Sequence, residues 1–382
     1  MKIAHLCLSN FFVDGYRYQE NELVREHVRQ GHDVVVIASC ETYDDHQQLT
    51  YVQPREYVGV EGARVVRVPY RRGLPLLAAR KLRMHPGIAR RLDAESPDVV
   101  MFHSLCGAEV LTAARWAAKH DVVFNIDSHE DRFNSARTSA SRLLHRFYYR
   151  PILQLAGRNL DSVLCISLDT IDFVHEMYGL ERTQLEFFPL GGQILDDAEY
   201  GERRARCRES LGIGPTERVL LQSGKFGARK KLPETLVAFT ATSDSAHLLL
   251  AGTIAPEVES EVRPLIDSDP RVRELGWCDS DGLTDLLCAA DVYVQPGTQS
   301  VTMQQALCCR NAVILDDVKS HGPYVDGNGW LVSSSGDLAV ALDEATRTDA
   351  NIDAMSKRSL TVAEELLDYA QLAVRVLRRS ER

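Results

Sequence analysis

The chain has 382 residues, of which 45% are hydrophobic and 26% charged, and its formal net charge at pH 7 is −10. This composition is ordinary for a globular protein, and the length suits two domains that each bury their own core. The acidic balance argues against a general nucleic-acid binder. Nine scattered cysteines without a CxxC pair argue against a disulfide framework or a zinc site. With no apolar run typical of a signal peptide or membrane span, we expect a cytoplasmic protein.

The first half of the chain alternates between short apolar runs and amphipathic stretches. The apolar runs predict buried strands at 2–8, 33–38, 63–68, 98–102, 122–126 and 162–166. A helix is predicted over about 19–30, where Gly31 ends it. This order of strand, helix and strand is typical of a doubly wound parallel sheet.

Polar residues follow two of these strands directly. His103 comes after the strand at 98–102, and His129 stands in the Asp-Ser-His-Glu sequence after the strand at 122–126. Because ligands bind at the carboxyl edge of a parallel sheet, both histidines are candidate site residues. A structural role is the alternative for each of them. Glu20 and Glu130 also lie near the proposed site, and we expect solvated or capping roles for both.

Two basic tracts that also carry apolar residues, 70–91 and 137–158, interrupt the acidic average. The strongest patch comprises Arg71, Arg72, Arg80, Lys81 and Arg83. Such a tract can lie on an anionic membrane surface, here the inner face of the plasma membrane. Two ordinary amphipathic helices with solvated faces are the alternative, and the sequence leaves both open.

The second half repeats the same plan after a Pro/Gly break at 187–192, where we place a hinge. Strands are predicted at 218–222, 247–251, 272–275, 291–295 and 312–315, and helices at 232–239, 256–265, 283–289, 301–309 and 338–379. We therefore expect one Rossmann-like domain at 1–190 and a second at 191–360. A C-terminal helix at 361–382 is expected to pack back on the first domain.

A strongly basic loop joins the first strand of the second half to its helix. It reads Ser-Gly-Lys-Phe-Gly-Ala-Arg-Lys-Lys over 223–231. Backbone N–H groups at a helix start, together with lysine side chains, bind phosphate well, so the loop predicts a phosphate or diphosphate site. A solvated basic turn is the alternative. The loop is neither a P-loop nor a GxGxxG motif.

At this point the chain resembles the retaining glycosyltransferases of family 4, which have the GT-B fold of two doubly wound Rossmann-like domains facing a cleft. The family motif Gly-Arg-x4-Lys-Gly corresponds to Gly224, Lys225, Lys230 and Lys231. The segments 248–252, 271–277 and 289–296 resemble further parts of its donor-binding domain. In the first half, Asp14-Gly15, Gly31-His32, His129 and Pro189-Leu-Gly correspond to family positions.

The resemblance implies an acceptor-binding first domain and a second domain that binds a UDP- or GDP-sugar. It implies that Lys225 and Lys230 hold the donor diphosphate and that His129 faces the donor sugar. The implied donor-binding residues are Gly15, Gly224, Trp277, Thr298, Gln299, Ser300 and Gln305. The implied reaction is transfer of a hexose, with retention of configuration, to a glycan or lipid-linked acceptor. No acidic pair is placed for a metal, so we expect neither a metal nor another cofactor.

One departure from the family affects the donor site. The family usually has two glutamates eight positions apart, and these positions hold Gly297 and Gln305 here. A glutamine amide can still hydrogen-bond a ribose hydroxyl, but it supplies no charge. Two alternatives therefore stay open: a non-catalytic GT-B-like module that binds a nucleotide sugar, and a nucleotide-sugar epimerase.

Overall fold

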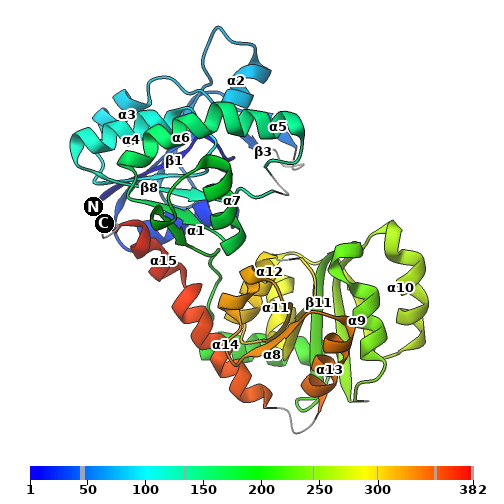
Figure 1. The fold of residues 1–382 in the computed structure, drawn as a ribbon. Coiled ribbons are helices and arrows are strands. Elements are labelled where there is room, and N and C mark those ends of the chain that lie inside the picture. Colours follow the sequence, from blue (N-terminus) through cyan, green and yellow to red (C-terminus); the bar gives the residue numbers. More distant parts are fainter. Residues whose placement is uncertain (44–47, 133–134, 244, 299, 348–350, 380–382) are drawn as a thin grey trace. The chain divides into compact units, whose positions relative to one another are not determined.

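The computed structural model describes the chain except residues 44–47, 133–134, 244, 299, 348–350 and 380–382. The chain divides into two compact units (Figure 1). Unit 1 comprises Met1–Pro189 and Tyr369–Arg382, and unit 2 comprises Leu190–Asp368. Each unit contains a sheet of mainly parallel strands with helices against it, so the predicted α/β class with two Rossmann-like domains is confirmed.

The sheet of unit 1 has the strand order β10-β9-β8-β7-β1-β2-β6-β5. The strands are β1 (Lys2–Cys7), β2 (Asp33–Ser39), β5 (Glu56–Val58), β6 (Arg64–Val68), β7 (Val99–Phe102), β8 (Val123–Ser128), β9 (Ser162–Cys165) and β10 (Leu185–Phe187). Only β5 pairs antiparallel in this sheet. The short strands β3 (Glu41–Tyr43) and β4 (Leu49–Tyr51) form a separate antiparallel pair.

Helices cover both faces of this sheet (Figure 1). They are α1 (Gln19–Arg29), α2 (Leu76–Leu82), α3 (Ile88–Glu95), α4 (Glu109–His120), α5 (Ser139–Leu144), α6 (Arg150–Ala156), α7 (Leu168–Tyr178) and α15 (Tyr369–Val376), with the π-helical turn η1 (His145–Tyr149) between α5 and α6. Residues of α3, α4 and α6 share one apolar cluster, whereas Leu23 of α1 packs with Leu372 of α15 in another. The central strands are buried on both faces, which explains their continuous apolar sequence.

The sheet of unit 2 has the strand order β13-β12-β11-β14-β15-β16, and all its strands are parallel. The strands are β11 (Arg218–Phe226), β12 (Ala246–Ile254), β13 (Val272–Gly276), β14 (Val292–Gln295), β15 (Ala312–Asp316) and β16 (Gly329–Val332). The helices are α8 (Asp197–Ser210), α9 (Leu232–Phe239), α10 (Pro256–Ser268), α11 (Ser280–Ala289), α12 (Val301–Cys308), α13 (Ser335–Thr346) and α14 (Ile352–Leu366). Residues of α9, α10 and α13 form one apolar cluster with the sheet.

Each sheet has a point at which the order of its strands reverses. In unit 1 the chain runs from β1 to β2 and β6, and later strands continue from β7 on the other side of β1. In unit 2 it runs from β11 to β12 and β13, and then continues from β14 on the other side of β11. The loops that leave the two strands at such a point diverge, and the crevice between them is where ligands bind in open α/β sheets.

The structure refines two expectations about secondary structure. Strand β11 continues to Phe226, so the predicted basic loop is shorter, and Ala228–Lys230 form the 3₁₀ turn η4 before α9. The stretch at 338–379, predicted to be helical, contains the end of α13 and the separate helices α14 and α15. The last of these belongs to unit 1, where His27 Nε2 lies 2.9 Å from Ala373 O. In the described part of the chain, no helix has the length and apolarity that a membrane span needs.

Candidate active site

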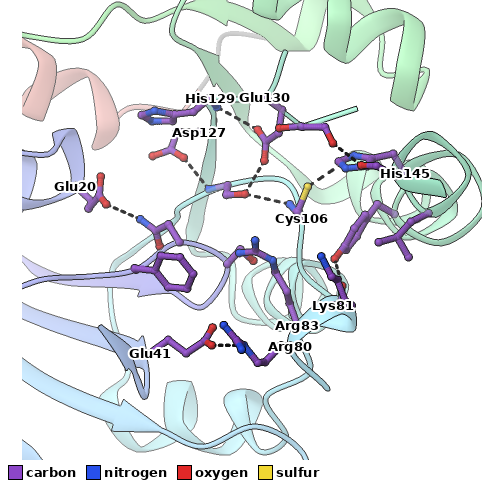
Figure 2. A pocket seen from close by; sticks show the side chains of 18 of the residues that line it. Glu20, Glu41, Arg80, Lys81, Arg83, Cys106, Asp127, His129, Glu130 and His145 are labelled. Carbon is purple, nitrogen blue, oxygen red and sulfur yellow. Dashed lines mark hydrogen bonds and ion pairs between the residues drawn. The ribbon is translucent and has the colours of Figure 1, made fainter. Parts of the chain in front are cut away.

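A cavity of about 770 Å³ lies at the strand-order reversal of unit 1 (Figure 2). Its lining comes from the loops after β1, β7 and β8, and from α1, α2 and η1. These positions include Asn10, Glu20, Arg83, Ser104, Cys106, Asp127, His129, Glu130 and His145. We call it the unit 1 cavity. The predicted site residue His129 lies in its wall, while His103 does not line it.

Glu130 joins the two loops that form one side of the unit 1 cavity. Its carboxylate accepts hydrogen bonds from Ser104 Oγ at 2.5 Å and from the backbone N–H of Leu105 at 3.1 Å. It also accepts from Ser128 Oγ at 2.6 Å and from the His129 N–H at 3.1 Å. Glu130 is only 4% exposed, so it is a buried carboxylate that caps both loops and not a solvated one.

Glu20, in the first turn of α1, is also buried, at 7% exposure. Its carboxylate accepts a 2.8 Å hydrogen bond from Asn10 Nδ2, in the loop after β1. Of the two expected roles, solvated or capping, the solvated one is wrong for Glu20, because α1 packs directly beside that loop. The amphipathic pattern of α1 did not reveal that its first turn faces a cavity.

Three buried histidines form a hydrogen-bonded chain that ends at the unit 1 cavity. His27 Nε2 lies 2.9 Å from Ala373 O in α15, and His27 Nδ1 lies 3.0 Å from His5 Nε2. His5 Nδ1 lies 2.9 Å from His103 Nε2, and His103 Nδ1 contacts Asp127 Oδ2. The other carboxylate oxygen of Asp127 accepts the Ser104 N–H. His103 therefore lies behind the cavity wall and contacts Asp127, which lines the cavity.

The number of protons in this chain is determined by its two ends. The Ala373 carbonyl can only accept, so His27 Nε2–H donates to it, His5 Nε2–H donates to His27, and His103 Nε2–H donates to His5. A contact of His103 Nδ1 with a carboxylate needs one more proton, since each neutral imidazole carries one. With His5 and His27 neutral, as their lowered pKa values indicate, this proton lies on His103 beside an anionic Asp127.

The pKa directions agree with this assignment. Burial opposes charge on His103, but Asp127 outweighs it and raises the pKa of His103. Burial likewise opposes charge on Asp127, but His103 outweighs it and the pKa of Asp127 is lowered. Burial is the main cause that lowers the pKa of His27 to about 4 and that of His5 well below its usual value. Both of these rings are therefore neutral near pH 7.

The corresponding place in unit 2 lies between the ends of β11 and β14. The Thr298 N–H donates to Arg229 O at 3.3 Å, so the loop after β14 contacts the turn η4. A Cβ atom added at Gly297 would lie 2.0 Å from that same carbonyl oxygen. This close approach excludes any side chain at 297, which gives a physical reason for glycine where the family has glutamate.

The two predicted phosphate-binding lysines flank this place. Lys225 is exposed near the end of β11, and Lys230 is half-buried in η4. A Cβ at Gly224 would lie 3.7 Å from Lys230 Nζ, so this side chain lies close to the backbone of β11, and Gly224 has φ 122°, which favours glycine. Burial lowers the pKa of Lys230. Among the described residues, neither ammonium group has an ion pair or hydrogen bond, whereas Lys231 Nζ pairs with Asp316 at 2.9 Å.

The other predicted donor residues of unit 2 lie at the same edge of its sheet or in α12. Trp277 follows β13 and is 77% exposed, and Thr298 is exposed. Ser300 is the N-cap residue of α12, with its hydroxyl on Gln295 Oε1. Gln299 lies outside the described residues.

Two predicted donor residues already have partners within the chain. The Gln305 amide accepts from the Gln193 N–H at 3.0 Å and donates to Gln193 O at 3.0 Å. In unit 1 the Gly15 N–H donates to Glu61 Oε1 at 2.9 Å, so it is occupied and does not point at a ligand. Within the described part of the chain, no group of three or more His, Cys, Asp or Glu side chains is placed to hold a metal ion.

Both units match known families, and the whole chain resembles solved structures. Residues 14–191 match the Glycosyl transferase 4-like domain, and residues 217–348 match Glycosyl transferases group 1. A comparison with curated protein sequences gave no match. Alr3699/HepE from Anabaena in complex with UDP is 15% identical, with a TM-score of 0.64 and 98% of each chain covered.

Two further solved structures are similar over the same length. Sucrose-phosphate synthase from Thermosynechococcus elongatus is 17% identical, with a TM-score of 0.62 over 98% of this chain and 97% of that one. WaaG, a glycosyltransferase involved in lipopolysaccharide biosynthesis, is 16% identical, with a TM-score of 0.60 over 98% and 99%. The family matches to both units and this shared architecture show that the chain belongs to the glycosyltransferases of GT-B fold.

Proposed function

We propose that this protein transfers a hexose from a nucleotide-sugar donor to a hydroxyl group of a glycan or lipid-linked acceptor, with retention of configuration and without a metal ion. The observation that carries the proposal is the pair Lys225 and Lys230, whose ammonium groups have no partner among the described residues and flank the strand-order reversal of unit 2. HepE, which shares the fold, has been solved with UDP and with UDP-glucose. This supports a UDP- or GDP-sugar as the donor.

In the proposed reaction the bond between the sugar C1 and the diphosphate oxygen breaks, and a bond between C1 and the acceptor oxygen forms on the same face. The acceptor hydroxyl gives its proton to the departing diphosphate, which leaves as a nucleoside diphosphate. Lys225 and Lys230 stabilise the negative charge that grows on the leaving group. His129 orients the transferred sugar through one of its hydroxyls. The segment of Trp277 receives the nucleobase.

The acceptor, in this proposal, enters the unit 1 cavity. The basic patch at its margin divides into two parts: Arg71 and Arg72 are exposed, while Arg80 and Arg83 line the cavity. Leu77, in α2, is 73% exposed beside this patch. We propose that Arg71, Arg72 and Leu77 make reversible contact with an anionic membrane at its inner face, where a lipid-linked acceptor is found.

Nucleotide binding and turnover test the proposal together. UDP and GDP, with their sugars, should raise the melting temperature because they bind the native state. Lys225→Ala and Lys230→Ala should each weaken binding of the preferred nucleoside diphosphate by at least about tenfold, the scale of a charge-assisted hydrogen bond. Lys231→Ala is the matched control, since its ammonium group pairs with Asp316.

Three outcomes of the turnover assay separate the candidate functions. Release of nucleoside diphosphate that requires an acceptor supports the transferase. Binding of donor without turnover against a broad set of acceptors supports a non-catalytic module. Conversion of the sugar to its epimer without an acceptor supports an epimerase. Unchanged affinity in both lysine variants contradicts the assigned donor site.

A further inference from the structure

Arg83 places a guanidinium group inside the unit 1 cavity. Among the described residues, its side chain makes no hydrogen bond or ion pair, whereas its neighbour Arg80 pairs with Glu41. In Figure 2 the Arg83 side chain extends into the middle of the cavity, between that pair and Cys106. Lys81, which also lines the cavity, likewise has no partner for its ammonium group within the described residues.

The backbone of Arg83 is held in an unfavourable conformation. As the C-cap residue of α2 it has φ 47° and ψ 55°, the left-handed region in which glycine is usual. The preceding residues are fixed by tyrosines of η1: Tyr149 OH donates to Lys81 O at 2.6 Å, and Tyr148 OH donates to Leu82 O at 3.2 Å. A strained residue that is not glycine and is held in place by its surroundings points to a function for its side chain.

Among the described residues, none of the four carboxylates that line the cavity pairs with Arg83, and each accepts hydrogen bonds from other groups. Glu20 accepts from Asn10, Glu41 from Tyr70 and Arg80, Asp127 from His103 and Ser104, and Glu130 from Ser104, Ser128 and two backbone N–H groups. Two other groups that are near enough to interact with the Arg83 charge, Cys106 and His145, are uncharged. Burial raises the pKa of the Cys106 thiol and lowers the pKa of His145, so both are neutral near pH 7.

We propose that Arg83 and Lys81 bind a phosphate monoester carried by the acceptor. This inference rests on the proposed function, since it names the acceptor class of the same reaction. A phosphate monoester near pH 7 carries about −1.5 to −2 charges, which matches two cations better than a single carboxylate does. The planar fork of a guanidinium pairs with two phosphate oxygens at once, and the lysine adds a point charge. The cavity of about 770 Å³ has room for a sugar phosphate.

The first test uses glucose 6-phosphate as a soluble probe and glucose as its uncharged counterpart, by calorimetry on the full chain. We expect the phosphate to bind and glucose not to bind detectably. Arg83→Gln should weaken the phosphate affinity at least about tenfold, and Arg83→Lys should weaken it less because the charge remains. Arg72→Gln is the matched control, since Arg72 is exposed and outside the cavity lining. UDP or GDP affinity, measured in parallel, should stay the same in all variants.

A glycine variant separates binding from folding. Arg83→Gly should keep or raise the melting temperature, because glycine adopts the left-handed conformation without strain, and it should lose the phosphate affinity. A large fall in melting temperature together with unchanged phosphate affinity would overturn the proposal.

A second arm identifies the source of the phosphate. Vesicles containing phosphatidic acid, a lipid monoester, are compared with phosphatidylglycerol vesicles of equal charge. Arg83-dependent binding to glucose 6-phosphate supports a soluble acceptor, and Arg83-dependent preference for phosphatidic acid supports a lipid-linked one. Phosphate binding that Arg83→Gln leaves unchanged, or no binding to either probe, refutes the site. If the wild type binds neither UDP nor GDP, that result contradicts the proposed function instead.

Discussion

The cationic His103 predicts an unusual pH dependence for the stability of unit 1. In the wild type, burial lowers the pKa of His103, but the attraction of Asp127 outweighs this effect and the pKa is raised. Its contribution to stability is therefore present below about pH 6.5, the unfolded value, and is lost as the pH rises through the folded value. Asp127→Asn removes the anion and provides an amide that can donate to His103 Nδ1. The ring should then stay neutral in the folded state.

The sign of the effect in Asp127→Asn follows from proton binding. Without Asp127, burial is opposed only by the smaller effect of Glu20, so folded His103 should stay neutral below about pH 6.5, whereas the unfolded chain takes up a proton there. The variant therefore loses about 1.4 kcal/mol per pH unit relative to the wild type as the pH falls. The difference in free energy of unfolding between wild type and variant is called the stability gap. Between about pH 8 and pH 5 this gap should widen by at least about 2 kcal/mol. His5 and His27 are buried and neutral in both proteins, so their own losses in acid cancel in the difference.

Urea unfolding followed by tryptophan fluorescence measures this gap. Trp116 lies in α4 of unit 1, and replacing Trp277 and Trp330 by Phe leaves it as the only reporter, which avoids mixing the transitions of two units. Asp33→Asn, an exposed carboxylate of the same unit, is the matched control and should show no widening. Nitrogen-15 NMR of the histidines should find both ring nitrogens of His103 protonated at neutral pH. A gap no wider at low pH, or a neutral His103 ring, refutes the proton count.

Three further predictions follow from the site. Activity should survive EDTA, because two lysines neutralise the leaving group; complete loss that magnesium or manganese restores contradicts the mechanism. Gln305→Leu should lower the stability of unit 2 by about 0.5–1 kcal/mol, since it removes two exposed hydrogen bonds to the Gln193 backbone that water replaces only in part, and an unchanged urea midpoint argues against that role. Arg71→Glu with Arg72→Glu should abolish co-sedimentation with anionic vesicles at low salt without changing nucleotide affinity, whereas a wild type that stays in the supernatant rules out membrane contact.

Local patterns in the sequence were sufficient for the architecture of both units. The continuous apolar runs of β1, β8, β11 and β14 predicted buried parallel strands, because a strand covered on both faces has no polar side. His129, directly after β8, was placed at a ligand-binding edge because ligands bind at the carboxyl ends of parallel strands, whereas Lys230 was predicted from the basic loop before α9. The family resemblance, carried by the motif around Gly224, predicted the GT-B fold, which the comparisons confirm.

Contacts between distant residues were beyond these patterns. His5 and His103 are 98 positions apart and meet only because β1 and β7 are neighbours in the sheet. Arg83 read as part of an exterior basic patch, yet the left-handed turn after α2 directs it into a cavity. The sequence by itself determined which segments become strands and helices, since these depend on neighbouring residues. The tertiary structure alone decided which charges are paired and which stay free for a ligand, because a partner is defined by distance in space.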